Sequence, residues 1–180
     1  GDVADVRRHI ASDPARVSKG KNPSLSPLQQ AILRNKTEIA VVLLEAKAEP
    51  NQVDGSKRTL VHLAVERGNA DLIPVLLECK ADPNLLDKDG WTPLHHAAAK
   101  DKVDVARALL DGGADVKTLS ARGGTPLHEG AASGSKEMIL LLLKHKTDPG
   151  VVSKTGVTAL DVARQSKNEA AIKILSAQAK

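Results

Sequence analysis

Aromatic side chains are almost absent from this sequence, which has Trp91 but no phenylalanine or tyrosine among its 180 residues. A core built on large rings is therefore excluded. Hydrophobic residues make up 41% of the chain and charged residues 27%, which is close to the globular average and unlike a disordered composition. The core must be assembled from Ala, Leu, Ile and Val, and these side chains favour close contact between helices.

Cysteine is also scarce, because Cys79 is the only one, and this excludes an internal disulfide framework. A chain without disulfides suits a reducing compartment, so we expect an intracellular location, cytoplasmic or nuclear. Long hydrophobic runs are missing as well. The longest, MILLLL at 138–143, is far shorter than the roughly 18 residues that cross a bilayer, so we expect no membrane insertion.

Charge of one sign is not concentrated anywhere in the chain. The formal net charge is +4, and the positive residues are scattered rather than gathered into a run. Without a dense basic patch or stacking aromatics we do not expect nucleic-acid binding, whereas the mild positive excess is a weak indication of an acidic protein partner.

What the sequence does contain is an internal repeat with a step of 33 residues. The segment TPLHHAAAK at 92–100 is echoed by TPLHEGAAS at 125–133. The related segments begin at Ser26, Thr59, Thr92, Thr125 and Thr158. A second series keeps the same step at Leu43, Leu76, Leu109, Leu142 and Leu175. Such a period is typical of repeat architectures, in which each short unit is stable only when it stacks on its neighbours.

Each unit is predicted to contain two helices and an extended turn. In the unit that begins at Thr92, this threonine is the expected N-cap, and Pro93 stands at the first helical position, where its missing N–H is not needed. The segment DVARALLDGG at 104–113 has the apolar spacing of a second helix, which its two glycines end. The stretch ADVKTLSARGG at 114–124 is suited to a protruding hairpin.

This pattern resembles the ankyrin repeat family, whose length of 33 residues and T-P-L-H-x-A signature match the units at Thr92 and Thr125. The resemblance implies an all-α solenoid of antiparallel helix pairs joined by short β-hairpin-like loops, one domain over residues 1–180, monomeric by itself. The expected divisions are a partial repeat at 1–20, repeats at 21–53, 54–86, 87–119 and 120–152, and a C-terminal capping repeat at 153–180. The opening GDVADVRRHI resembles a second helix whose first helix is missing, so the visible start is expected to be a boundary or a partial cap.

Several positions depart from the family pattern. Gln29 and Asp161 replace the histidine of TPLH, as expected of terminal units. Lys57 replaces a hairpin glycine that the other units keep, which predicts a rearranged tip around 54–56. Non-glycine residues also stand where the family has a left-handed glycine after the second helix, at a cost of about 1 kcal/mol each, and only Gly113 conforms. These residues are Lys47, Lys80 and Lys146.

The resemblance also implies a partner-binding surface on the concave face, formed by hairpin tips and the outer positions of the first helices. Trp91 beside Arg58 is a candidate hot spot, although the tryptophan could instead pack on its own hairpin. A basic row, Arg34, Arg67 and Lys100, could read acidic groups or simply stabilise helix C-termini by ~0.3–1 kcal/mol. The full set of predicted partner-binding residues is Trp91, Arg58, Arg34, Arg67, Lys100, Glu66, Leu25, Ser133 and Val157.

No catalytic or metal site is predicted. The histidines of the TPLH-like segments are expected, by the resemblance, to hydrogen-bond backbone between neighbouring units, since helices packed ~8–10 Å apart hold such side chains too far apart to share one zinc ion. Cys79 is expected to be a small core filler, and no nucleophile, Walker or dinucleotide motif is present. We expect neither enzymatic activity nor a cofactor. The histidines are His62, His95 and His128.

Three alternatives stay open. Asn51 and Asn84 resemble hairpin asparagines that an oxygen-dependent hydroxylase modifies in this family, although a turn-stabilising role is the simpler interpretation. The chain could also be a regulatory or targeting segment of a larger enzyme or channel. An engineered ankyrin scaffold is the third alternative, against which the units differ freely from one another.

Overall fold

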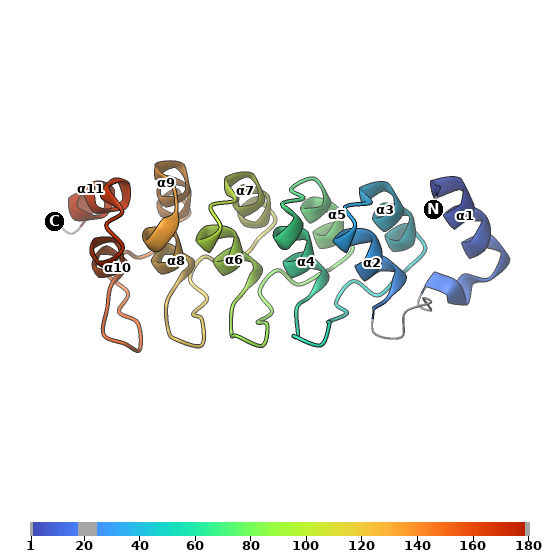
Figure 1. Cartoon of the computed structure of the whole chain (residues 1–180), viewed down its shortest axis with the longest axis horizontal. Helices are drawn as coiled ribbons and strands as arrows, with labels where there is room; N and C mark the ends of the chain where they lie inside the picture. The colour runs from blue at the N-terminus through green and yellow to red at the C-terminus, as the bar shows by residue number, and fades with distance from the viewer. Residues whose placement is uncertain (1, 18–24, 179–180) are drawn as a thin grey trace. The chain divides into compact units, whose positions relative to one another are not determined.

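The computed structural model describes residues 2–17 and 25–178, and the chain divides into two compact units, Gly1–Asp82 and Pro83–Lys180, called unit 1 and unit 2 below (Figure 1). Unit 1 contains α1 (Val3–Ser12), a 3-10 turn (Pro14–Val17), α2 (Pro27–Leu33), α3 (Thr37–Glu45), α4 (Leu60–Arg67) and α5 (Leu72–Glu78). Unit 2 contains α6 (Pro93–Ala99), α7 (Val103–Asp111), α8 (Pro126–Ser133), α9 (Lys136–Lys144), α10 (Ala159–Gln165) and α11 (Glu169–Gln178). The predicted all-α helix pairs are confirmed. Over the residues described, no helix has the length and apolar character needed to cross a membrane.

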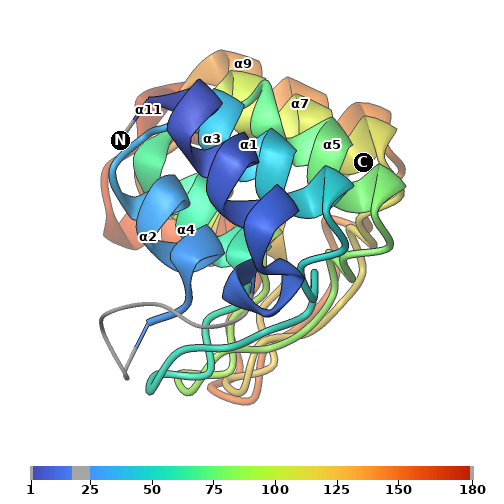
Figure 2. The same ribbon diagram turned by 90° about the vertical axis from the view of Figure 1, so that its right-hand side faces the viewer.

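Each unit has two layers of helices. In unit 2 the first helices of the repeats pack in the order α6, α8, α10, and the second helices in the order α7, α9, α11. In unit 1, α2 packs on α4 and α3 on α5, while α1 packs on α3. The helix α1 therefore takes the place of a second helix, as its sequence predicts. The hairpins of unit 2 extend to one side of its helices in both views (Figures 1 and 2).

The core of each unit is aliphatic, as the composition predicts. In unit 1 the fully buried side chains include Leu60, Leu63 and Ile73, and in unit 2 they include Leu94 and Leu127. Buried alanines accompany them on the first helices, and their small side chains let these helices approach one another closely. The alanines are Ala31, Ala64, Ala97, Ala98, Ala131, Ala159 and Ala163.

The first helices begin at side chains that satisfy free backbone N–H groups. In α6, Thr92 is the N-cap and Pro93 the first helical residue, as predicted. The Thr92 side chain accepts from the His95 N–H, and the Thr92 N–H donates to His95 Nδ1 at 3.3 Å. Gln29 does the same in α2, where its Oε1 accepts the Ser26 N–H at 2.8 Å. Because these reciprocal bonds recur, the TPLH-like segment sets where each first helix starts.

The lysines predicted in left-handed conformation have it. Lys47, Lys80 and Lys146 have φ of 66°, 70° and 63°, and Gly113 has 92°. After α5 the Lys80 N–H donates to the Leu77 carbonyl, and the Ala81 N–H donates to the Leu76 carbonyl at 2.9 Å. This is the pattern in which a left-handed residue closes a helix, and it favours glycine.

The rearranged hairpin tip predicted at residues 54–56 is wrong. The Asp54 N–H donates to the Arg58 carbonyl at 3.0 Å, as the Asp87 N–H does to the Trp91 carbonyl at 2.9 Å. Lys57 has φ of 57°, in the region that the corresponding Gly90 also occupies. The hairpin therefore keeps its form, and the lysine takes up the strain in its backbone.

Candidate partner-binding surface

The hairpins of unit 2 are joined to one another at their tips. The Ala121 N–H donates to the Gly90 carbonyl at 3.0 Å, and the Lys154 N–H donates to the Arg122 carbonyl at 3.0 Å. Gly90 has φ of +75°, and a Cβ atom there would lie 2.3 Å from the Cβ of Ala121. Because of these backbone contacts, side chains carried by successive hairpins have a fixed spacing.

A large apolar side chain is exposed immediately before each described hairpin. In unit 2 these are Leu86, Leu119 and Val152, which are 45%, 50% and 58% exposed. We call these three residues the hairpin apolar row. Val53 occupies the corresponding place in unit 1 and is 51% exposed. The sequence analysis missed this row, although the 33-residue step between its members was present to find it.

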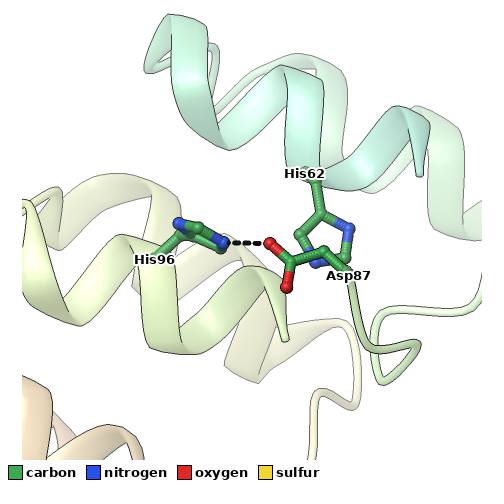
Figure 3. A group of neighbouring side chains, drawn as sticks. All are labelled: His62, Asp87 and His96. Carbon is green, nitrogen blue, oxygen red and sulfur yellow. Dashed lines mark hydrogen bonds and ion pairs between the residues drawn. The ribbon is translucent and has the colours of Figure 1, made fainter. Parts of the chain in front are cut away.

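Trp91 packs on the first helix of its own repeat. Its ring centroid lies 5.0 Å from that of His96 and 6.2 Å from that of His95. His96 Nε2 in turn donates to the buried carboxylate of Asp87 at 2.7 Å, and Figure 3 shows these two side chains facing each other. The second carboxylate oxygen of Asp87 accepts the Trp91 N–H at 2.9 Å. Trp91 is thus a half-buried side chain held against the hairpin and the helix, with part of its surface open to solvent.

Arg58 and Glu66, both predicted contact residues, are brought together in unit 1. Arg58 Nη1 donates to Glu66 at 2.6 Å, while its Nε donates to Asp54 at 2.9 Å. Burial alone would raise the pKa of Asp54, but hydrogen bonds from the Arg58 side chain and from the Arg58 and Ser56 N–H groups hold that pKa below its usual value. The guanidinium therefore links the hairpin of unit 1 to α4 and is half-buried.

The remaining predicted contact residues lie near the ends of first helices or just before their starts. Arg34 and Lys100 are the C-caps of α2 and α6, and both are exposed. Arg67 ends α4 and is exposed. Ser133 ends α8, where its hydroxyl donates to the Ala99 carbonyl at 2.8 Å. The half-buried Leu25 and Val157 precede the caps of α2 and α10.

Glu129 adds a half-buried carboxylate to the first turn of α8. Burial raises the pKa of this side chain, and the positive charge of Arg122 on the neighbouring hairpin partly offsets that effect. A partner that approaches this position meets an acid whose charge is already poorly solvated.

The histidines of unit 2 join neighbouring repeats, as the resemblance implies. His95 Nδ1 accepts from Thr92, so its Nε2–H donates to the Gly124 carbonyl at 3.1 Å. His128 Nε2 donates in the same way to Val157 at 3.3 Å. Burial lowers the pKa of His95 to about 4 and also lowers the pKa of His128. Both side chains are therefore neutral structural donors at pH 7.

The hairpin asparagines also form bonds between repeats. In unit 1, Asn51 donates to the Lys80 carbonyl at 3.0 Å and accepts the Asp82 N–H at 2.8 Å. In unit 2, Asn84 accepts the Asp115 N–H at 2.8 Å. These bonds give each side chain a role in holding the next loop, and the hydroxylation suggested by the resemblance stays a prediction.

Cys79 is not the core residue that the sequence predicts. It is the C-cap of α5 and is only half-buried, because it follows the last residue of the helix instead of lying within it.

Comparison with known families agrees with this architecture. A model described as ankyrin repeats in three copies matches residues 28–120, which is more than half of the chain, and an ankyrin repeat model matches residues 122–154. No curated protein matches the sequence. The chain belongs to the ankyrin repeat family.

Proposed function

We propose that this chain is a non-catalytic module for protein–protein interaction, as ankyrin repeats in general are. It binds a protein or peptide partner through its hairpin tips and the outer positions of its first helices. The sequence analysis predicts that these positions form the concave face of the repeats.

The hairpin apolar row is the observation that carries the proposal. A single exposed leucine is ordinary on a protein surface. A large apolar side chain at the same place in each hairpin of unit 2 is different, because all three are about half exposed and recur at every repeat. Burying these apolar side chains against a partner would contribute favourable free energy to binding.

Within each unit, the predicted contact residues lie in or beside the hairpins or at the ends of first helices, and we assign them to the partner-binding positions of that unit. In unit 2 these are Trp91, Lys100, Ser133 and Val157, and in unit 1 they are Leu25, Arg34, Arg58, Glu66 and Arg67. Arg58 and Glu66 already bind each other, so a partner that uses either one has to replace a 2.6 Å ion pair. Arg34 and Arg67, which are exposed, are better placed to attract acidic groups from solution.

The proposal is tested with a variant in which Leu86, Leu119 and Val152 are changed to serine. Leu140 on α9 provides a matched control, because it is 45% exposed and lies on a second helix. Immobilised wild-type chain and L140S are expected to capture the same proteins from a cell extract, whereas the triple variant loses them with its thermal unfolding unchanged. Equal capture by all three chains would contradict the proposal.

A Trp91→Ala variant separates the two interpretations of this side chain. If Trp91 is a hot spot, the variant loses captured proteins while its unfolding midpoint falls little. If it only packs on His96 and the hairpin, stability falls and the folded variant keeps its partners.

The basic positions make a separate prediction about the partner's charge. Replacing Arg34, Arg67 and Lys100 by glutamine is expected to slow association and to flatten its dependence on salt, because exposed charges act at long range and are screened. If the salt dependence of the association rate is unchanged in this variant, the proposal that the partner is acidic is wrong.

A further inference from the structure

The hairpin apolar row has a spacing that selects among partner conformations. Packed helices lie ~8–10 Å apart, and each hairpin of unit 2 is tied to the next by a backbone hydrogen bond of 3.0 Å. Leu86, Leu119 and Val152 therefore present one apolar side chain about every 8–10 Å. A partner must offer its own apolar groups at this interval and on one side.

An extended chain with three residues per turn meets this requirement. A polyproline II segment rises ~3.1 Å per residue, so every third side chain returns to the same side after ~9 Å. In a β-strand, successive side chains alternate between two faces, so every third one points the other way. An amphipathic helix presents an apolar stripe about 100° wide, with two or more apolar residues per turn. The three side chains of the hairpin apolar row would leave part of that stripe uncovered.

The charges around the row define the polar part of the partner. Arg122 and Lys154 are exposed on the second and third hairpins of unit 2, and Lys117 is exposed two residues before Leu119. On the first hairpin, the exposed Lys88 is followed by the exposed Asp89, so that tip has no excess of either sign.

Acids also lie near these tips, and on the second hairpin Arg122 already acts on Glu129, whose pKa is raised by burial and lowered by this positive charge. The carboxylate of Asp115 accepts the Lys117 N–H and the Thr118 hydroxyl, at 2.9 and 3.2 Å. Asp148 accepts the Gly150 N–H at 2.8 Å. The exposed cations of the second and third tips are Arg122 and Lys154, which follow Leu119 and Val152 by three and two residues. Lys154 Nζ donates to the Ala121 carbonyl at 3.0 Å. These cations favour acidic side chains on the partner.

We infer that unit 2 binds an extended, polyproline II-like peptide segment with apolar residues at every third position and acidic residues between them. The segment lies along Leu86, Leu119 and Val152, with its carboxylates toward Arg122 and Lys154. This inference rests on the proposed function and adds the conformation, the spacing and the charge of the partner.

The test uses a library of random 12-residue peptides displayed on phage and selected on the full chain. The inference predicts that enriched peptides have apolar residues at positions i, i+3 and i+6 with Asp or Glu between them. Synthetic copies are expected to lose roughly tenfold in affinity on Leu119→Ser and to keep it on the control Leu140→Ser. A permuted copy of the same composition, with its apolar residues alternating, is expected to bind weakly.

Charge is tested with the same peptides. Arg122→Glu is expected to weaken binding several-fold at low salt, while Arg107→Glu, at an exposed position on the second helix α7, leaves it unchanged. Peptides that carry a helical apolar stripe or basic residues, yet respond to Leu119→Ser, would overturn the inference and leave the proposed function standing. Peptides unaffected by any hairpin variant would overturn both, and a library without enriched peptides would overturn the inference alone.

Discussion

The stability of unit 2 should fall as the pH is lowered from 6.5 to 4, because His95 is buried in its neutral form. Its side chain is completely inaccessible, and burial lowers its pKa to about 4 from an ordinary value of 6.5. Between these two values the unfolded chain binds a proton that the folded chain does not, so unfolding is favoured as pH falls. The contribution is fully present above pH 6.5 and is lost by about pH 4, a loss of roughly 3 kcal/mol.

Other groups act in the same range, and the variant isolates His95 from them. The lowered pKa of His128 adds a loss of the same sign. The raised pKa of Glu129 has the opposite effect, since its protonation is favoured in the folded chain. In a His95→Gln variant these two effects remain and only the His95 titration is removed. Glutamine suits the position, because Gln29 accepts the N-cap N–H at the corresponding place in unit 1.

Urea unfolding at a series of pH values, followed by Trp91 fluorescence, measures the effect directly. Trp91 is the sole tryptophan and lies 6.2 Å from His95 between ring centroids, so it reports on this part of unit 2. We expect His95→Gln to be less stable by about 1 kcal/mol at pH 7, because the bond to the Gly124 carbonyl is lost. The difference should shrink and then reverse toward pH 4. Parallel stability profiles of the two chains would refute the neutral, buried state of His95.

Three further predictions concern stability. Lys80→Gly should stabilise the chain by about 0.5–1 kcal/mol in urea unfolding, because φ of 70° favours glycine, and Gly113→Ala should destabilise it by a similar amount; equal midpoints would contradict this. Gly90→Ala should lower the unfolding free energy by at least about 1 kcal/mol more than Gly156→Ala. Both glycines have positive φ, but of the two only Gly90 has Ala121 beside it. Equal losses would contradict the close contact. Gln29→His should raise the thermal midpoint by an amount equivalent to about 1 kcal/mol. The reason is that the buried Gln29 Nε2 lacks a hydrogen-bond partner, whereas a histidine there could donate to the next repeat. A lower midpoint would contradict this prediction.

Much of the fold could be predicted because the same sequence pattern recurs in each repeat, so each inference is supported at several places in the chain. The TPLH-like segments set the starts of the first helices through short-range bonds, such as that from the Thr92 N–H to His95. The left-handed conformation of Lys80 followed from its place in the unit, where the helix has to close. These are local effects, and local sequence determines them.

The sequence analysis was wrong or incomplete for two kinds of residue. One kind has an environment that depends on distant parts of the chain, and the other is a lysine that adopts a strained backbone conformation. Lys57 adopts φ of 57° because the hairpin bonds around it outweigh its preference for negative φ. The contact from Arg58 to Glu66 depends on how the hairpin folds back over α4, which no spacing reveals. The 33-residue spacing of the hairpin apolar row is present in the sequence, but the exposure of its side chains is known only from the structure.

The central claim, that the hairpin face of this chain binds a partner, is tested most directly by mapping backbone amide shifts in solution while a captured partner or selected peptide is added. The account predicts shifts at residues 86–91, 119–124 and 152–157 and at the ends of the first helices, with α7, α9 and α11 little affected. Shifts concentrated on those second helices, with the hairpins unchanged, would contradict it.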